Sequence, residues 1–334
     1  ENGFIADYDP TAPIEVNYRQ NFAGEPTGKS HPELLYNLKP SPNHGHDQSI
    51  VNGISRIGFM KGGGKALWKD ENIADSITSH AIDFIRRNHE EPFFMYLCTN
   101  DIHVPRFPHP RFRGKTDMGH RGDAIVQFDW TIGEVMKTLK ELNIDKNTII
   151  ILTSDNGPVV DDGYDDEAVA RLGSHKPSGP LRGNKYSSFE GGTRVPFIVS
   201  WPHGINKAKD SEALVSQIDL FASFAQMLNA RLPKGSCPDS RKHWDALVGK
   251  DSKGCEYVVE QNLWNVLSIR TNDWKYIEPS NGASYMKLTD IETGNSPLPQ
   301  LYDMNHEGEK VNLAEEHPDI VENLKGILKG EREK

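Results

Sequence analysis

Four polar side chains lie beside short apolar runs, where buried strands would present them at the edge of a sheet. They are His103, after the run 93–97; Asp155 and Asn156, after the run 148–152; and Lys185, in a glycine-rich stretch before the run 195–199. Adjacent carboxylate and amide oxygens are hard ligands suited to Ca²⁺ or Mg²⁺ rather than zinc. Lysine can bind an anion, and histidine can pass a proton near neutral pH. We therefore expect a metal and anion site at one rim of the sheet.

Each part of this set would more often be structural on its own. Asp-Asn-Gly at 155–157 is a common turn. A lone histidine is more often structural, and a lysine in a glycine-rich loop is usually a solvated surface charge. The combination is more specific than any part, because the three stretches all lie at ends of predicted strands.

Amphipathic helices separate these apolar runs. Apolar residues recur at three- and four-residue spacing over 73–85, 125–139 and 214–228, which predicts three helices. Apolar strands without alternation, placed between such helices, are typical of a parallel sheet covered on both faces. The predicted fold class is therefore α/β, with a mixed, mostly parallel sheet between helices.

The sequence changes in character after about residue 233. Short strands are predicted at 257–260, 266–270, 274–277 and 300–303, followed by a closing helix at 318–328 with Pro318 in its first turn. These elements predict a small α+β domain with a short antiparallel sheet and one helix. We therefore expect a larger domain at 1–236, which begins with an extended segment, and a small domain at 237–334.

Composition argues against two classes of function. The chain has 334 residues and a formal net charge of −10, which is unfavourable for binding nucleic acid. No apolar run is long enough to span a membrane. The cysteines, Cys98, Cys237 and Cys255, form neither paired metal spacing nor an even disulfide framework. A protein with this net negative charge could still bind an anionic ester, but only through a local basic pocket.

Several motifs together resemble the type I sulfatases of the alkaline phosphatase superfamily. They are Thr-Ser-Asp-Asn-Gly-Pro at 153–158, Arg-Gly-Asn-Lys-Tyr-Ser-Ser-Phe-Glu-Gly-Gly-Thr-Arg-Val-Pro at 182–196, Phe-Phe-Met-Tyr-Leu with Asp-Ile-His-Val-Pro within 93–105, and Leu-Tyr-Asp-Met at 301–304. The resemblance runs from about His44 to the end and is greatest to arylsulfatase-type enzymes of Bacteroidetes. It implies an alkaline-phosphatase-like fold in which 1–236 is part of the catalytic domain.

The resemblance also implies an activity. A sulfatase of this kind cleaves sulfate monoesters, of carbohydrates or of aryl alcohols, with a formylglycine and a calcium ion. By match, Asp155 and Asn156 would be ligands of Ca²⁺, with Mg²⁺ as the alternative. Lys185 would bind the sulfate group, and His103 would hydrogen-bond the ester oxygen and assist proton delivery to the leaving group. The resemblance further implies an extracytoplasmic location, in a periplasm.

The departures from the family pattern concern the nucleophile. Family members carry an N-terminal aspartate pair and a Cys-x-Pro-x-Arg motif whose cysteine or serine becomes formylglycine, and this sequence has neither. Cys237-Pro-Asp-Ser-Arg241 has its proline in the wrong position and is predicted to be a loop. This chain by itself therefore lacks the nucleophile. We expect the nucleophile to lie in an N-terminal segment of the same protein that is missing from this chain.

Weaker candidates surround this set. His175 and Arg182 are predicted to line the pocket that binds the leaving group, typically a sugar, although surface loop residues often have no specific role. The acidic run 161–167 does not fit an EF-hand and is predicted to be a solvated loop. Two other functions stay open: a phosphatase or phosphodiesterase of the same superfamily, which would usually hold two zinc ions, and an inactive protein that binds sulfated glycans.

Overall fold

The computed structural model describes residues 7–306 and 308–334. The chain forms two compact units, each described by itself. The first unit comprises Glu1–Asp145 and Val160–His175, and the second comprises Lys146–Val159 and Lys176–Lys334. The boundary expected after residue 236 lies inside the second unit, and it stays a prediction of where the C-terminal subdomain begins.

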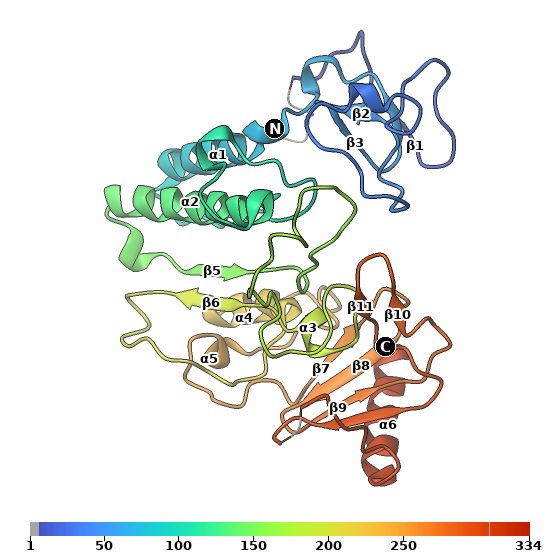
Figure 1. Ribbon diagram of the computed structural model, residues 1–334. Helices are drawn as coiled ribbons and strands as arrows, with labels where there is room; N and C mark the ends of the chain where they lie inside the picture. The colour runs from blue at the N-terminus through green and yellow to red at the C-terminus, as the bar shows by residue number, and fades with distance from the viewer. Residues whose placement is uncertain (1–6, 307) are drawn as a thin grey trace. The chain divides into compact units, whose positions relative to one another are not determined.

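Two helices packed side by side make up much of the first unit, and both were predicted (Figure 1). α1 (Ile73–Asn88) buries Ala74, Ala81 and Ile85 on one face. α2 (Gly119–Glu141) begins earlier than its apolar spacing suggested, because its first turns bury polar groups rather than apolar ones. The Thr78 hydroxyl donates to Thr131 across 3.2 Å, which joins the two helices through a buried polar contact.

The N-terminal part of the first unit is built from short extended pieces. Its antiparallel pairs are β1 (Glu15–Asn17) with β4 (Phe59–Lys61) and β2 (Ile50–Val51) with β3 (Ile54–Ser55). Single turns of 3-10 helix are η1 (Pro32–Leu34), η2 (Gly64–Ala66), η3 (Asp70–Asn72) and η4 (Pro110–Phe112). From residue 7 onward, these short pieces agree with the extended segment expected at the start of the chain.

The run 93–97 is extended but is not part of a sheet, so the strand predicted there is wrong for this structure. Its side chains alternate in exposure, with Phe94 71% and Tyr96 80% exposed. A strand exists only when its backbone groups pair with a neighbour, and no described residues form a sheet with this run. Apolar residues alone therefore did not make it a strand.

The second unit begins with a strand pair that corrects a second expectation. β5 (Ile150–Thr153) and β6 (Phe197–Ser200) pair antiparallel, with Ile151 opposite Val199. Among the strands of residues 7–306 and 308–334 every pairing is antiparallel, so the mostly parallel sheet is not present. An apolar run fixes burial but not strand direction, which depends on the partner.

Short helices flank this pair in the second unit. They are η5 (Asp145–Asn147) at the junction, α3 (Glu190–Thr193), η6 (Gln217–Asp219), α4 (Leu220–Met227) and α5 (Trp244–Leu247). The helix predicted over 214–228 is thus shorter than expected, because the segment before η6 is extended. Cys237 and Arg241 lie in a non-helical stretch of turns, as predicted.

The C-terminal sheet and helix agree with the predicted α+β arrangement (Figure 1). The antiparallel strands, in order, are β12 (Gln300–Asp303), β9 (Trp274–Ile277), β8 (Leu267–Thr271) and β7 (Tyr257–Gln261), with α6 (Pro318–Arg332) packed on one face. A separate hairpin is formed by β10 (Tyr285–Met286) and β11 (Ile291–Glu292).

The two faces of this sheet have different roles. Ile269, Tyr276 and Leu301 pack against Val321 and Leu324 of α6. Because side chains alternate along a strand, the neighbours of Tyr276 point to the opposite face. There Ile277 packs with Phe189, which belongs to the loop that carries Lys185. The sheet is therefore the support of that loop.

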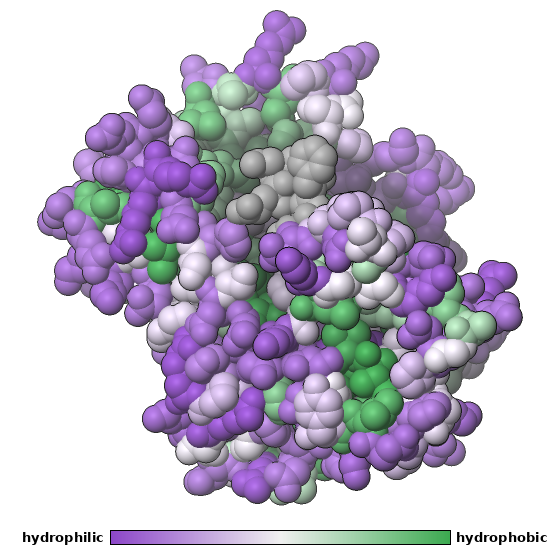
Figure 2. All heavy atoms as spheres, turned by 90° about the horizontal axis from the view of Figure 1, so that it is seen from above, coloured by the Kyte–Doolittle hydropathy of each residue, from purple (hydrophilic) through white to green (hydrophobic). Residues whose placement is uncertain are grey.

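The surface is mostly polar. On the face drawn in Figure 2, hydrophilic residues cover most of the surface and apolar residues appear in separate patches. In the described part of the chain, every helix is too short or too polar to cross a membrane.

Candidate active site

The turn that carries Asp155 and Asn156 follows β5 directly, as predicted. Asp155 Oδ1 accepts the backbone N–H of Asn156 at 2.9 Å, and the Asn156 amide donates to Gly157 O at 2.9 Å. Asp155 is exposed. The turn therefore presents a carboxylate and an amide carbonyl, two hard oxygen donors, beyond the end of β5.

Close backbone packing holds this turn in place. The Gly157 N–H donates to Gly192 O at 2.9 Å. A Cβ on Gly157 would stand 1.8 Å from Gly191 O, which no side chain can do. Gly157 is therefore required so that the turn can lie against α3.

Lys185 is tied to the same turn through its backbone. The Lys185 N–H donates to Pro158 O at 2.8 Å, and the Gly191 N–H donates to Arg182 O at 2.7 Å, closing the loop on itself. Tyr186 has φ of 76°, a left-handed conformation that is rare for an aromatic residue and is typical of functional loops. The Lys185 ammonium lies 5.1 Å from the Tyr186 ring centroid. The structure thus brings Asp155, Asn156 and Lys185 into one backbone-linked assembly.

The donor set of this assembly fits a hard divalent cation. Ca²⁺ takes six to eight oxygen ligands, roughly, from carboxylates, amides, carbonyls and water. Within the described residues, the hydrogen bonds to the Asp155 carboxylate reach Oδ1, and Oδ2 accepts none. Asp155 and Asn156 would supply two of the ligands, and sulfur or imidazole donors that would favour zinc are not part of this turn.

Arg182 is engaged within the second unit. Its Nε donates to Glu292 at 2.8 Å, a second guanidinium nitrogen also contacts that carboxylate, and the guanidinium lies 3.9 Å from the Phe189 ring centroid. These contacts raise the pKa of Arg182, chiefly through the hydrogen bond to Glu292. Arg182 anchors the Lys185 loop to β11, and its role in substrate binding stays a prediction.

His103 lies in the first unit, in the segment after the run 93–97. Its Nδ1 is 2.7 Å from Val104 O, and since a carbonyl only accepts, Nδ1 carries the hydrogen. The neutral ring is therefore the tautomer whose Nε2 takes up a proton and, once protonated, donates it. His103 is exposed, so its ring is accessible from solvent. Its function as a proton donor stays a prediction.

Asp101 was not identified from the sequence, although it lies in the same motif. Burial raises its pKa to about 6, against the opposing hydrogen bond from Gln127 at 3.0 Å. Its Oδ2 is buried and has no hydrogen-bond partner among the described residues. A carboxylate a few residues after an apolar run was the signal that could have identified it.

His175 and the acidic run also lie in the first unit. His175 is exposed, its N–H donates to Leu172 O at 3.2 Å, and its predicted role in binding the leaving group is untested. The expectation of a solvated loop at 161–167 is wrong for Asp162 and Asp166, which are buried. Asp166 accepts a hydrogen bond from buried Arg106 at 2.6 Å. The Arg106 guanidinium therefore takes the place of the water that would solvate an exposed carboxylate.

Glu190 is a second residue that sequence reasoning missed. At the start of α3 it lies 3.3 Å from Lys275, 3.4 Å from Arg270 and 3.5 Å from Arg194. Although burial favours the neutral form, these cations hold the pKa of Glu190 below its ordinary value. The Glu190 N–H donates to Glu309 at 2.8 Å. Ion pairs of the sheet thus fix the end of the Lys185 loop.

The chain is similar to known proteins over most of its length. A sequence profile described as Sulfatase matches residues 15–230, more than half of the chain. N-acetylgalactosamine-6-O-sulfatase of Bacteroides thetaiotaomicron is 52% identical over 98% of this chain and 64% of its own length. N-acetylgalactosamine-6-sulfatase of the mouse is 31% identical over 49% of this chain and 30% of its own length. The chain thus spans less than two thirds of these relatives.

Solved structures give the same result for the fold. One, described in work on glycosaminoglycan metabolism by Bacteroides thetaiotaomicron, has a TM-score of 0.94 and 52% identity, and covers 98% of this chain and 67% of its own. A sulfatase from Pseudoalteromonas sp. has a TM-score of 0.65 at 21% identity and covers 78% of this chain and 52% of its own, which shows the fold alone. An α/β fold of the alkaline-phosphatase-like type fits the chain, although the described residues form no parallel sheet.

Proposed function

Because the chain belongs to the sulfatase family, we propose that it carries the metal- and sulfate-binding residues of a sulfuric ester hydrolase that acts on sulfated carbohydrates. One observation carries this proposal: the Asp155–Asn156 turn and the Lys185 loop are joined by the hydrogen bonds of Gly157 and Lys185. An oxygen-rich cation site and a fixed lysine beside it are the parts needed to hold a sulfate group by its oxygens.

Lys185 is the residue we assign to the sulfate group. Its ammonium binds a sulfate oxygen and neutralises charge that develops as the sulfur–oxygen bond breaks. The loop limits how far the residue can move, since its backbone is bonded to Pro158 and its end is fixed through Glu190. Little reorganisation is then needed when the ester binds.

Asp155 and Asn156 are the residues we assign to Ca²⁺, with Mg²⁺ as the alternative. When bound, the ion would polarise the sulfate oxygens and a formylglycine would supply the attacking oxygen. Asp155 contributes the negative charge that attracts the cation, while Asn156 adds a neutral oxygen. Gly157 keeps both residues at their place beside α3.

His103 is the residue we assign to the leaving group. Its Nδ1–H is held by Val104 O, so Nε2 is the atom that would donate a proton to the departing alcohol oxygen. Asp101, two residues earlier, has a pKa raised by burial to about 6. It is therefore a second group able to hold a proton in the same segment.

We propose that the partner of this chain is an N-terminal segment of the same protein that carries the formylglycine. The motif Cys-x-Pro-x-Arg is absent from the 334 residues. In addition, the extended run 93–97 exposes its aromatic rings, with Tyr96 80% exposed. A strand contributed by that segment would pair with this run and cover those rings.

The substrate we propose is an N-acetylgalactosamine 6-sulfate unit, or another sulfated sugar of a glycosaminoglycan. This rests on the relative that is 52% identical over nearly the whole chain. A polysaccharide of this kind lies outside the cell, so we propose an extracytoplasmic, periplasmic location.

The test is hydrolysis of N-acetylgalactosamine 6-sulfate by the natural protein, including any segment that precedes this chain. Lys185→Met should lower kcat/KM by about 100-fold or more, as expected for loss of one group that stabilises charge in the transition state. Lys207→Met, at an exposed lysine of the same unit, is the matched control. Equal activity of the two variants would refute the assignment of Lys185.

The main alternative is a phosphatase or phosphodiesterase. A phosphonate monoester hydrolase shares the fold, at 15% identity, so the fold alone does not separate the two reactions. An aryl sulfate and an aryl phosphate should therefore be compared, with calcium or zinc restored after chelation. Faster, zinc-dependent turnover of the phosphate would refute the sulfatase proposal. Binding of a sulfated glycan without any turnover would instead favour an inactive binding protein.

A further inference from the structure

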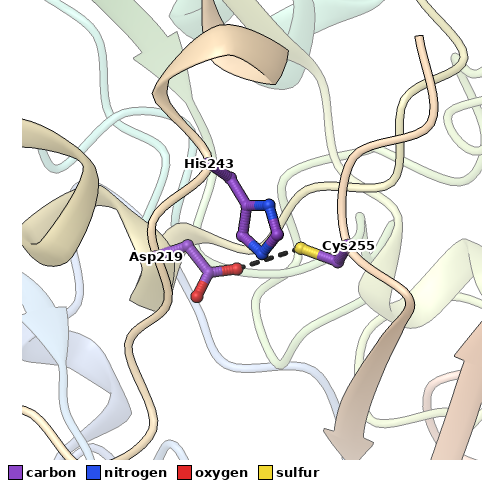
Figure 3. A group of neighbouring side chains, drawn as sticks. All are labelled: Asp219, His243 and Cys255. Atoms are coloured by element: carbon purple, nitrogen blue, oxygen red, sulfur yellow. Dashed lines mark hydrogen bonds between the residues drawn. The ribbon is translucent and has the colours of Figure 1, made fainter. Parts of the chain in front are cut away.

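Three side chains able to bind a metal meet inside the second unit, away from the turn of Asp155. They are Asp219, at the end of η6; His243, directly before α5; and Cys255, in the segment that leads into β7. One ligand atom from each lies within 4.8 Å of the others. Figure 3 shows the imidazole ring pointing toward the hydrogen bond between the other two side chains. Three segments distant in sequence thus converge on one point.

The backbone around the cluster holds each residue in place. Asp219 Oδ1 accepts the Arg241 N–H at 2.7 Å, which leaves Oδ2 for Cys255 Sγ at 3.1 Å. The His243 N–H donates to Ser223 Oγ at 2.9 Å, and the Cys255 N–H donates to Leu214 O at 2.7 Å. Outer hydrogen bonds of this kind orient the ligands in protein metal sites.

The cluster contains an unsatisfied polar atom. His243 Nε2 is buried and has no hydrogen-bond partner among the described residues. A buried ring nitrogen without a partner is unfavourable, because it has lost water and gained nothing in return. Since Figure 3 shows the ring directed at the carboxylate and the thiol, a cation placed among the three would satisfy it.

We propose that Asp219, His243 and Cys255 form a zinc site distinct from the calcium site proposed at Asp155. Sulfur, imidazole nitrogen and carboxylate oxygen are the ligands of tetrahedral zinc, and water would complete the fourth position. Zinc bonds of about 2.0 to 2.3 Å place ligand atoms about 3.4 to 3.6 Å apart, so small side-chain rotations suffice. Calcium, which takes oxygen ligands only, does not suit this set.

Charge favours the same ion. Zn²⁺ releases the thiol proton on binding, so the two positive charges of the metal balance one thiolate and one carboxylate. A net charge of zero at the site matters because Asp219 and Cys255 are both buried, and an unbalanced charge is costly to bury. The site would cross-link the starts of α4 and α5 to the segment entering β7, which makes it a structural site within the second unit.

A cysteine–histidine nucleophile is the other chemistry that these residues suggest, and the geometry opposes it. Cys255 is 1% exposed, so no substrate reaches its sulfur. Its hydrogen bond goes to Asp219, not to His243, whereas an activated thiol must transfer its proton to a base. Without a cation, the contact in this cluster is a hydrogen bond from the Cys255 thiol to the Asp219 carboxylate.

The test is a titration of the full chain with Co²⁺, after saturation with Ca²⁺ to fill oxygen sites. A thiolate–cobalt charge-transfer band should appear in the near ultraviolet, saturate near one equivalent and disappear when Zn²⁺ is added. Cys255→Ser should abolish the band, and His243→Gln should weaken binding by roughly 100-fold. Cys237→Ser, at another free cysteine, should leave the band unchanged.

The outcomes separate cleanly. A band that depends on Cys255 and His243 but not on Cys237 supports the zinc site. Absence of the band in the wild-type chain, or its persistence in Cys255→Ser, refutes the site. If Cys255→Ser does not fold, the wild-type spectrum and His243→Gln decide, since the His243 side chain is only half buried. None of these results depends on sulfatase activity.

Discussion

Lys275→Met removes a buried cation that forms ion pairs with three carboxylates. Lys275 is 0% exposed, and its ammonium lies 2.9 Å from Glu260, 3.3 Å from Glu190 and 3.5 Å from Glu309. Burial favours the neutral amine, but the three carboxylates raise the pKa of Lys275 well above its ordinary value. The lysine is therefore charged in the folded protein, and methionine of similar length would delete that charge alone.

The size of the effect follows from the burial of the partners. Glu190 and Glu309 are both nearly inaccessible to solvent. Glu190 keeps Arg270 and Arg194 as partners, whereas the ion pair of Glu309 with Lys275 is lost. Removing one partner of a buried ion pair leaves an uncompensated charge and lowers stability by about 3 to 5 kcal/mol. Lys325→Met is the matched control, because its ion pair with Glu322, at 3.0 Å, is exposed. The control should change stability by less than about 1 kcal/mol.

The assay is urea unfolding followed by circular dichroism, with hydrogen exchange of the β8 and β9 amides as a local measure. Burial raises the pKa of Glu309 to about 7, even with the lysine present. At pH 5 this carboxyl is protonated in the fold, so the loss in Lys275→Met should be smaller there than at pH 8. A loss below about 1 kcal/mol at pH 8, equal to that of the control, would refute the reasoning.

Three further outcomes follow from the same contacts. Gly157→Ala should lower stability by about 2 to 4 kcal/mol or displace the metal turn, because its Cβ would meet Gly191 O; unchanged unfolding and activity would contradict this. Arg182→Lys should lower stability by about 1 to 2 kcal/mol in urea unfolding, since lysine cannot form the two-point contact with half-exposed Glu292. The Glu309 pKa of about 7 lies above its ordinary 4.5, so the fold binds the proton more tightly. Stability should therefore fall by about 3 kcal/mol between pH 4.5 and 7, and Glu309→Gln should remove that fall when unfolding is measured across this range.

The elements that need only their own sequence were predicted well. α6 begins at Pro318, whose fixed φ and missing N–H suit a first helical turn. The strands β7, β8, β9 and β12 agree with their predicted runs within one or two residues. Each is short, bounded by turns and apolar on the face that meets α6. Local patterns of this kind determine an element wherever its neighbours are also in the chain.

The features that depend on distant partners could not be predicted. The run 93–97 has a strand's composition but no sheet to join. β5 and β6 have the apolar character of parallel strands, yet they pair antiparallel, because direction is set by the connection and not by the run. A lysine within Trp-Lys-Tyr-Ile gives no sign that Glu190 and Glu309, far away in sequence, will bury it.

The candidate site shows the same division. The Asp155–Asn156 turn and Lys185 were recognised from their motifs, and their backbone link confirms that they lie together. The pairing of Arg182 with Glu292 was missed, because that partner comes from a hairpin more than 100 residues later. Motifs identified the residues that we propose to bind metal and sulfate, while the residues that hold them in place depend on the fold.

The connectivity of the two units constrains how the chain can fold during synthesis. Residues 146–159 belong to the second unit, 160–175 return to the first, and the remainder of the second unit follows. When β5 leaves the ribosome, its partner β6 has not yet been made, and the strands β7 to β12 come later still. The first unit is therefore complete only after residue 175, when the first strand of the second unit has already been made. The second unit is complete only when the C-terminal strands and α6 have followed. We therefore expect slow folding, with apolar strands exposed while synthesis continues, and a requirement for chaperones during production.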